Sequence, residues 1–117
     1  MNFFTKKELS CPCCDSYFFK EETLEMLDEA RKKAGIAFII SSACRCEKHN
    51  KEVGGSPLSA HKTGEAVDLI FQNSNEAFLI LESLIFVGFR RIGINFKKGF
   101  IHVDSSKTLP QEVLFHY

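Results

Sequence analysis

Two histidines and an aspartate in this sequence have the residue types of a zinc site. His61 and Asp68 lie on either side of Gly64, seven residues apart, and His102 lies at the centre of a second apolar segment. Catalytic zinc commonly takes three protein ligands, histidine nitrogens and a carboxylate oxygen, and leaves a fourth position for water. The three side chains therefore predict one bound zinc ion, Zn2+. Taken singly, they could also be a loop histidine, a turn aspartate and a core histidine.

The local pattern indicates how these side chains could converge. From residue 65 onward the side chains alternate, which predicts a strand with Asp68 on its less apolar face. A helix would instead separate His61 from Asp68 by about 10 Å along its axis, too far for easy joint ligation. If this strand is the neighbour of a second predicted strand at residues 99–105, Asp68 and His102 can meet. A bend at Gly64 would bring His61 over the same point.

The elements around these residues predict a small α+β fold, with an antiparallel sheet, helices packed on one side and the zinc site on the sheet. Helices are predicted at residues 23–34 and 74–87, with a short helix or turn at 47–53 between them, and strands at 36–40, 65–71, 89–95 and 99–105. In the helix at 74–87 we expect Phe78, Leu81, Leu84 and Ile85 to face inward. The tail from residue 107 is too mixed to assign. The length predicts one domain, residues 1–117.

Composition excludes several classes of partner. Fifteen basic and fifteen acidic side chains cancel, so no nucleic acid is expected as principal partner. No apolar run reaches the roughly 20 residues that span a bilayer, so we expect no membrane insertion. The first residues contain no apolar signal segment, so we expect the protein to be cytoplasmic when made.

The five cysteines form two clusters, Cys11, Cys13 and Cys14, then Cys44 and Cys46. The two-residue gap between Cys11 and Cys14 is common in zinc sites, and the second cluster could complete a four-thiolate site. Reduced, mostly buried thiols and a disulfide between the clusters are the alternatives. A thiol redox protein is a further reading, although no thioredoxin-like context surrounds the cysteines.

The pattern Ser59-x-His61-x-x-Gly64-x-Ala66-x-Asp68, followed by His102-Val103-Asp104, resembles the M15 zinc peptidases. These include D-alanyl-D-alanine carboxypeptidases, vancomycin-resistance D,D-dipeptidases and phage L-alanyl-D-glutamate endolysins. Residues 42–50 and 53–59 also resemble the small phage-type members, and the likeness runs from about residue 36 to 105. It implies a hedgehog/D,D-peptidase-like fold.

The resemblance implies a role for each matching residue. His61, Asp68 and His102 would be the zinc ligands. Arg45 would stabilise the oxyanion or grip a substrate carbonyl, unless it only forms a surface salt bridge. Ser59 would be a supporting or substrate-contacting hydroxyl.

The sequence departs from the family at one position. Many members carry an acid three residues before the final histidine, as general base, and here that residue is Gly99. Asp104 lies about 7 Å along the strand from His102. It could act as the base or hold His102 in its proper tautomer. Glu65 is a poorer candidate, because the alternation points it away from Asp68.

The implied activity is zinc-assisted hydrolysis of a peptidoglycan stem peptide, at a D-Ala-D-Ala or an L-Ala-D-Glu bond, by a carboxypeptidase or endopeptidase. A monomeric phage or prophage lysis protein, acting on the cell wall after release by a membrane-permeabilising partner, would fit. The alternative is a non-hydrolytic, zinc-stabilised binding module of the hedgehog type, since Gly99 replaces the usual acid.

Overall fold

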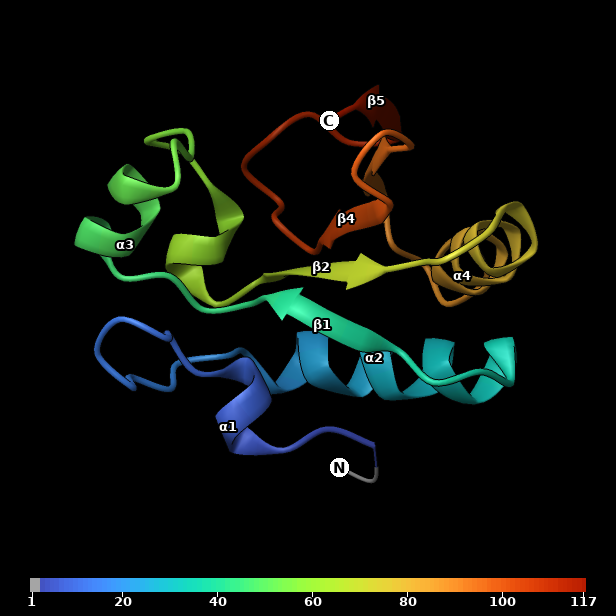
Figure 1. Ribbon diagram of the computed structural model, residues 1–117, viewed down its shortest axis with the longest axis horizontal. Helices are drawn as coiled ribbons and strands as arrows, with labels where there is room; N and C mark the ends of the chain where they lie inside the picture. Colours follow the sequence, from blue (N-terminus) through green and yellow to red (C-terminus); the bar gives the residue numbers. More distant parts are fainter. Residues whose placement is uncertain (1–2) are drawn as a thin grey trace.

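The computed structural model describes residues 3–117 as a five-stranded mixed sheet with helices, which confirms the α+β class (Figure 1). In space the strands follow the order β1-β2-β4-β3-β5. Their bounds are β1 (Ile39–Ser42), β2 (Ala66–Ile70), β3 (Arg91–Asn95), β4 (Phe100–Asp104) and β5 (Val113–His116). The helices are α1 (Lys6–Leu9), α2 (Glu21–Ala34), α3 (Glu47–Glu52), the 3-10 helix η1 (Ala60–Thr63) and α4 (Ser74–Phe86).

The prediction of a wholly antiparallel sheet was wrong at one edge. The pairs β1–β2, β2–β4 and β3–β4 are antiparallel, and β3 and β4 form the predicted hairpin. Strand β5 comes from the tail that the sequence left unassigned, and it pairs with β3 in parallel. The chain crosses back after β4 before it pairs, so β5 runs in the same direction as β3.

The helices α2 and α4 pack together over one face of the sheet. Val67 and Leu69 of β2 and Ile101 and Val103 of β4 belong to the hydrophobic core. The helices contribute apolar side chains to the same core, including Leu24, Leu27, Ile80 and Leu84. Because successive strand residues point to opposite faces, Asp68 and His102 lie on the face away from these two helices. The period-two alternation thus places the apolar side chains on one face of the sheet and Asp68 and His102 on the other.

The predicted inward face of α4 was partly wrong. Leu84 is buried as expected, but Phe78 and Ile85 are 58% and 54% exposed, while Ala77 and Ile80 are buried. This helix is apolar on nearly every side, so its periodicity does not select a face. The first strand also lies later in the chain than predicted. Its pairing with β2 starts at Ile39 and continues through Ser42, so the strand covers Ile39–Ser42 rather than residues 36–40.

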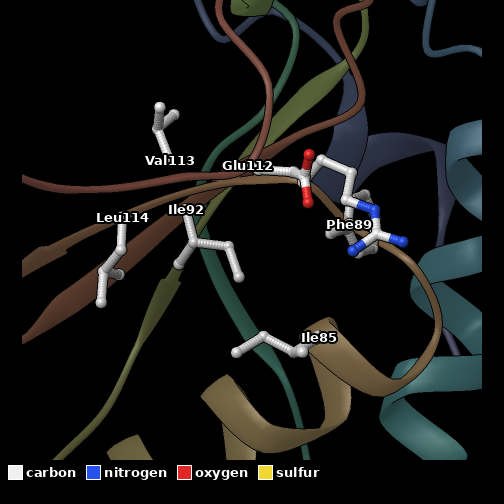
Figure 2. Close-up of a pocket in the computed structure, with 7 residues that line it drawn as sticks. Ile85, Phe89, Ile92, Glu112, Val113 and Leu114 are labelled. Carbon is white, nitrogen blue, oxygen red and sulfur yellow. The ribbon is translucent and has the colours of Figure 1, made fainter.

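Figure 1 shows α3 at one end of strand β2 and α4 at the other. A hollow of about 190 Å³ lies beside the α4 end, where Ile85, Ile92 and Leu114 surround it (Figure 2). Its described lining residues include no histidine or cysteine, so it offers no metal site. Among residues 3–117, no helix has the length and apolar character needed to cross a membrane.

Candidate metal centre

The structure brings His61, Asp68 and His102 together, as the sequence predicted. One ligand atom from each lies within 4.8 Å of the others, and all three side chains are buried. Asp68 and His102 are direct cross-strand partners in β2 and β4. Asp68 Oδ1 lies 3.0 Å from His102 Nδ1 and 3.3 Å from His61 Nε2. The carboxylate oxygen is therefore the point at which both imidazoles meet.

A short helical turn places His61. Ser59 precedes η1, and its Oγ accepts a hydrogen bond from the His61 backbone N–H at 3.2 Å. The turn ends at Gly64, whose φ of +74° lies in the left-handed region. A Cβ at this position would also lie only 2.1 Å from the Phe18 carbonyl oxygen. Glycine is thus required twice, by its conformation and by the close approach of Phe18.

Hydrogen bonds on the far side of each imidazole fix its tautomer. His61 Nδ1 lies 2.7 Å from the Ala43 carbonyl oxygen, which can only accept, so Nδ1 carries the proton. His102 Nε2 lies 2.7 Å from Asp104 Oδ2 and donates to it. The other nitrogen of each ring therefore faces Asp68, hydrogen bonds with it in the metal-free protein, and can bind a metal ion once it carries no proton. Three electron-pair donors that converge on one buried point fit a divalent cation, and the donor set is one that zinc accepts.

The electrostatics of the three residues suit the same purpose. Burial opposes ionisation of Asp68, but hydrogen bonds from His102 and His61 outweigh it and hold the pKa of Asp68 below its ordinary value. Burial lowers the pKa of His61. Burial also acts to lower the pKa of His102, but its hydrogen bonds to Asp104 and Asp68 raise it overall. At neutral pH the carboxylate is ionised and His61 is neutral, which are the forms that bind metal, whereas the raised pKa of His102 means that a metal ion would displace a proton from that ring.

Arg45 lies beside this centre and is only 7% exposed, so it is not the surface salt bridge considered as an alternative. Its Nε donates to Ser42 Oγ at 3.1 Å and its Nη1 to Asn50 Oδ1 at 3.2 Å. Its Nη2 lies 3.5 Å from Asp68 Oδ2. A Cβ at Gly55 would lie 2.1 Å from Asn50 Oδ1, so the close approach of this loop requires glycine. The guanidinium is therefore held in one orientation.

Asp104 lies behind His102 and is 1% exposed. Its Oδ2 contacts His102, while its Oδ1 accepts from Arg91 Nε at 2.8 Å and from the Ser106 backbone N–H at 3.1 Å. Both oxygens are therefore occupied by neighbours that fix the carboxylate in place.

The two other positions considered for the general base supply none. Glu65 accepts a hydrogen bond from Thr63 Oγ1, outside the metal centre. Gly99, at the position of the usual acid, lies in the hairpin turn with a φ of +74°. Among the residues that the structure describes, neither position places a carboxylate over the three ligands.

Sequence reasoning missed Tyr117. Its ring stacks on His102, with ring centroids 4.8 Å apart and an interplanar angle of 11°. Burial and then the charge of Asp68 raise the pKa of Tyr117. The one available signal was alternation in the tail, because Val113, Phe115 and Tyr117 share one face of an extended chain.

Two cavities flank the centre. One, of about 270 Å³, is lined by Ser59, His102 and Asp104 among others. The second, of about 410 Å³, is lined by Arg45, Asp68 and Lys98 among others. Ser56 and Tyr117 line both cavities. The first cavity thus reaches the candidate metal centre at His102 and the second reaches it at Asp68, whereas His61 is fully buried and lines neither.

Comparison with known proteins agrees with this geometry. A family model described as Peptidase M15 matches residues 2–104, a span that contains His61, Asp68, His102 and Arg45. A search of curated proteins finds no match. The match covers most of the sequence and confirms the resemblance seen there, so the chain belongs to the peptidase M15 family.

Proposed function

We propose that this chain is a zinc-dependent peptidase in which His61, Asp68 and His102 hold the metal on a hedgehog/D,D-peptidase-like sheet. One observation carries the proposal. The outer nitrogen of each imidazole donates to a fixed acceptor, so both inner nitrogens and the Asp68 carboxylate face one buried point where they can bind a metal ion together. Membership of the M15 family supports a metal-dependent hydrolase of peptide bonds.

Bound zinc would polarise the scissile carbonyl and lower the pKa of a coordinated water. Arg45 then stabilises the negative charge that develops on the carbonyl oxygen, because its guanidinium is buried and held by three neighbours. Ser59 fixes His61 through its cap and contacts substrate in the smaller cavity. Tyr117 offers its phenol to substrate between the two cavities.

Of the two roles considered for Asp104, the contacts favour positioning. Its carboxylate keeps the proton of His102 on Nε2 and so keeps Nδ1 free for the metal. The ion pair with Arg91 holds that carboxylate in place. Asp104 acts on the reaction through His102.

The substrate we propose is a peptidoglycan stem peptide, cut at a D-Ala-D-Ala or an L-Ala-D-Glu bond. Arg45 and Lys98 both line the larger cavity, where Arg45 is paired with Asp68 and Lys98 is left to bind a carboxylate of such a peptide. A monomeric lysis protein of a phage or prophage, reaching the cell wall after release from the cytoplasm, is the context that fits this substrate.

One observation favours a second candidate, a non-hydrolytic binding module of the hedgehog type. Gly99 replaces the usual acid, and both oxygens of Asp104 are occupied. In that case zinc would only fix the fold and the cavities would bind peptide without cutting it.

Digestion of defined peptides separates these functions. Zinc-loaded protein is incubated with purified cell wall and with synthetic stem peptides that contain either bond, and mass spectrometry identifies the new termini. Cleavage that is lost on chelation and in Asp68→Asn supports the peptidase. Glu47→Gln, which alters only an exposed pair with Lys62, is the matched control. Bound zinc without cleavage would favour the binding module, and failure to bind zinc at the three ligands would refute both.

A further inference from the structure

Three cysteine thiols form a second cluster, separate from the three residues of the metal centre. Cys11 and Cys14 precede α2, and Cys46 is the N-cap residue of α3. Their sulfur atoms all lie within 4.8 Å of one another, and none of the three is in a disulfide. Two segments more than thirty residues apart in sequence therefore deliver soft metal ligands to one place.

A tight turn directs two of these thiols to the same side. The Cys11 N–H donates to the Ser16 carbonyl and the Asp15 N–H donates to the Cys11 carbonyl, both at 2.8 Å. Asp15 takes a φ of +60°, in the left-handed region, as the chain reverses. The reversal folds Cys14 back beside Cys11, which is the geometry that the two-residue gap between metal-binding cysteines produces.

Backbone amides donate to two of the sulfurs. The Cys46 N–H points at Cys11 Sγ and the His49 N–H points at Cys46 Sγ, each at 3.4 Å. A sulfur that accepts from N–H groups is stabilised as the thiolate, which is the form that binds metal. Cys11 is buried in the hydrophobic core and Cys46 packs against it, so these two N–H groups are the polar contacts that would stabilise their thiolates.

The fourth position of a tetrahedral site has a candidate in Cys13. Cys13 lies in the same turn as Cys14, and its thiol is exposed. Cys44, which the sequence offered as a ligand, is buried in the core and does not belong to the cluster of three thiols. The set that the structure assembles therefore differs by one cysteine from the set expected from the spacing.

We propose that Cys11, Cys14 and Cys46 bind a structural zinc ion, with Cys13 as the fourth ligand. Each coordinating thiol gives up its proton to solvent as the sulfur–zinc bond forms. The ion joins the N-terminal segment to the start of α3, one residue beyond Arg45. The thiol cluster shares no residue with the centre of His61, Asp68 and His102. Its proposed binding of zinc therefore does not depend on whether that centre hydrolyses peptides.

Cobalt substitution tests the site without any assay of activity. The reduced full-length chain is stripped of metal and titrated with Co2+ alone, and absorption is recorded in the near ultraviolet. Thiolate ligands give intense sulfur-to-cobalt charge-transfer bands, whereas histidine and aspartate ligands give none. We expect these bands, their loss in Cys14→Ser, and their weakening in Cys13→Ser.

Two measurements keep the result decisive. Cys44→Ala, which removes a core thiol outside the cluster, should keep the bands. Zinc content by elemental analysis should show one zinc fewer per chain in Cys14→Ser than in the wild type. Absence of charge-transfer bands in the folded, reduced wild type would overturn the proposal, and so would unchanged bands in Cys14→Ser.

Discussion

Replacement of Asp104 by asparagine separates the two roles that this carboxylate was considered for. The side chain is 1% exposed and accepts from His102 at 2.7 Å, Arg91 at 2.8 Å and the Ser106 N–H at 3.1 Å. Asparagine keeps the shape, but its amide nitrogen cannot accept a hydrogen bond, so either His102 or Arg91 loses its partner.

The size of the effect follows from those contacts. A hydrogen bond to a charged group contributes about 1.5–3 kcal/mol. Loss of the partner behind a metal-binding histidine typically weakens metal affinity about 10- to 100-fold, which corresponds to roughly 1.4–2.7 kcal/mol. The two ranges agree. We therefore expect the zinc dissociation constant of Asp104→Asn to rise about 10- to 100-fold.

Competition with a chromophoric chelator measures this constant, and kcat is then measured on a cleavable stem peptide at saturating zinc. A positioning residue loses zinc affinity and largely keeps kcat once zinc is saturating. A general base loses kcat while zinc affinity stays unchanged, and that result would refute the positioning role. Asp28→Asn, on helix α2, is the charge-matched control. Thermal unfolding of each variant confirms that it is folded.

Three further changes test the rest of the centre. Arg45→Lys cannot reproduce the contacts to Ser42, Asn50 and Asp68, so kcat/KM should fall about 10²- to 10³-fold with unchanged zinc content; a fully active variant would contradict the role of the guanidinium. Tyr117→Phe keeps the stacked ring but removes the hydroxyl group, and should raise KM about two- to tenfold in steady-state kinetics without changing zinc affinity. In metal-free protein the pKa of Asp68 is lowered, so the unfolded chain binds more protons as pH falls and stability should decrease below about pH 4. In urea unfolding, the free energy of unfolding should fall less steeply with decreasing pH in Asp68→Asn than in the wild type. Equal slopes in the two proteins would disprove this contribution.

The convergence of His61, Asp68 and His102 could be predicted because local patterns place these residues. Gly64 marks the turn that carries His61, and the alternation around Asp68 assigns that carboxylate to the face away from the core. Pairing of β2 with β4 then needed only the expectation that two apolar strands are neighbours. The assignment of Arg45 depended on the resemblance, since nothing in its own spacing predicts a buried guanidinium.

The parts that sequence missed depend on contacts distant along the chain. Strand β5 is short and follows a polar crossover, so its parallel pairing with β3 has no local signal. Tyr117 reaches His102 only through that pairing. The prediction of the inward face of α4 was wrong for another reason. Apolar residues surround the helix, and only its packing against α2 and the sheet buries Ile80 rather than Phe78.

Backbone hydrogen bonds connect the two proposed metal sites through the segment that carries Arg45. The Cys44 N–H donates to the Leu9 carbonyl at 3.1 Å, and the Arg45 N–H donates to the His61 carbonyl at 3.0 Å. Cys46, the next residue, donates to Cys11 Sγ. Residues 44–46 therefore lie between the N-terminal segment on one side and η1 on the other. The backbone N–H of each of the three residues donates a hydrogen bond to one of these neighbours. A small domain gains rigidity from such a crosslink because metal binding there stabilises the folded state alone. The thiol cluster would thus hold Arg45 in place without contacting the peptide.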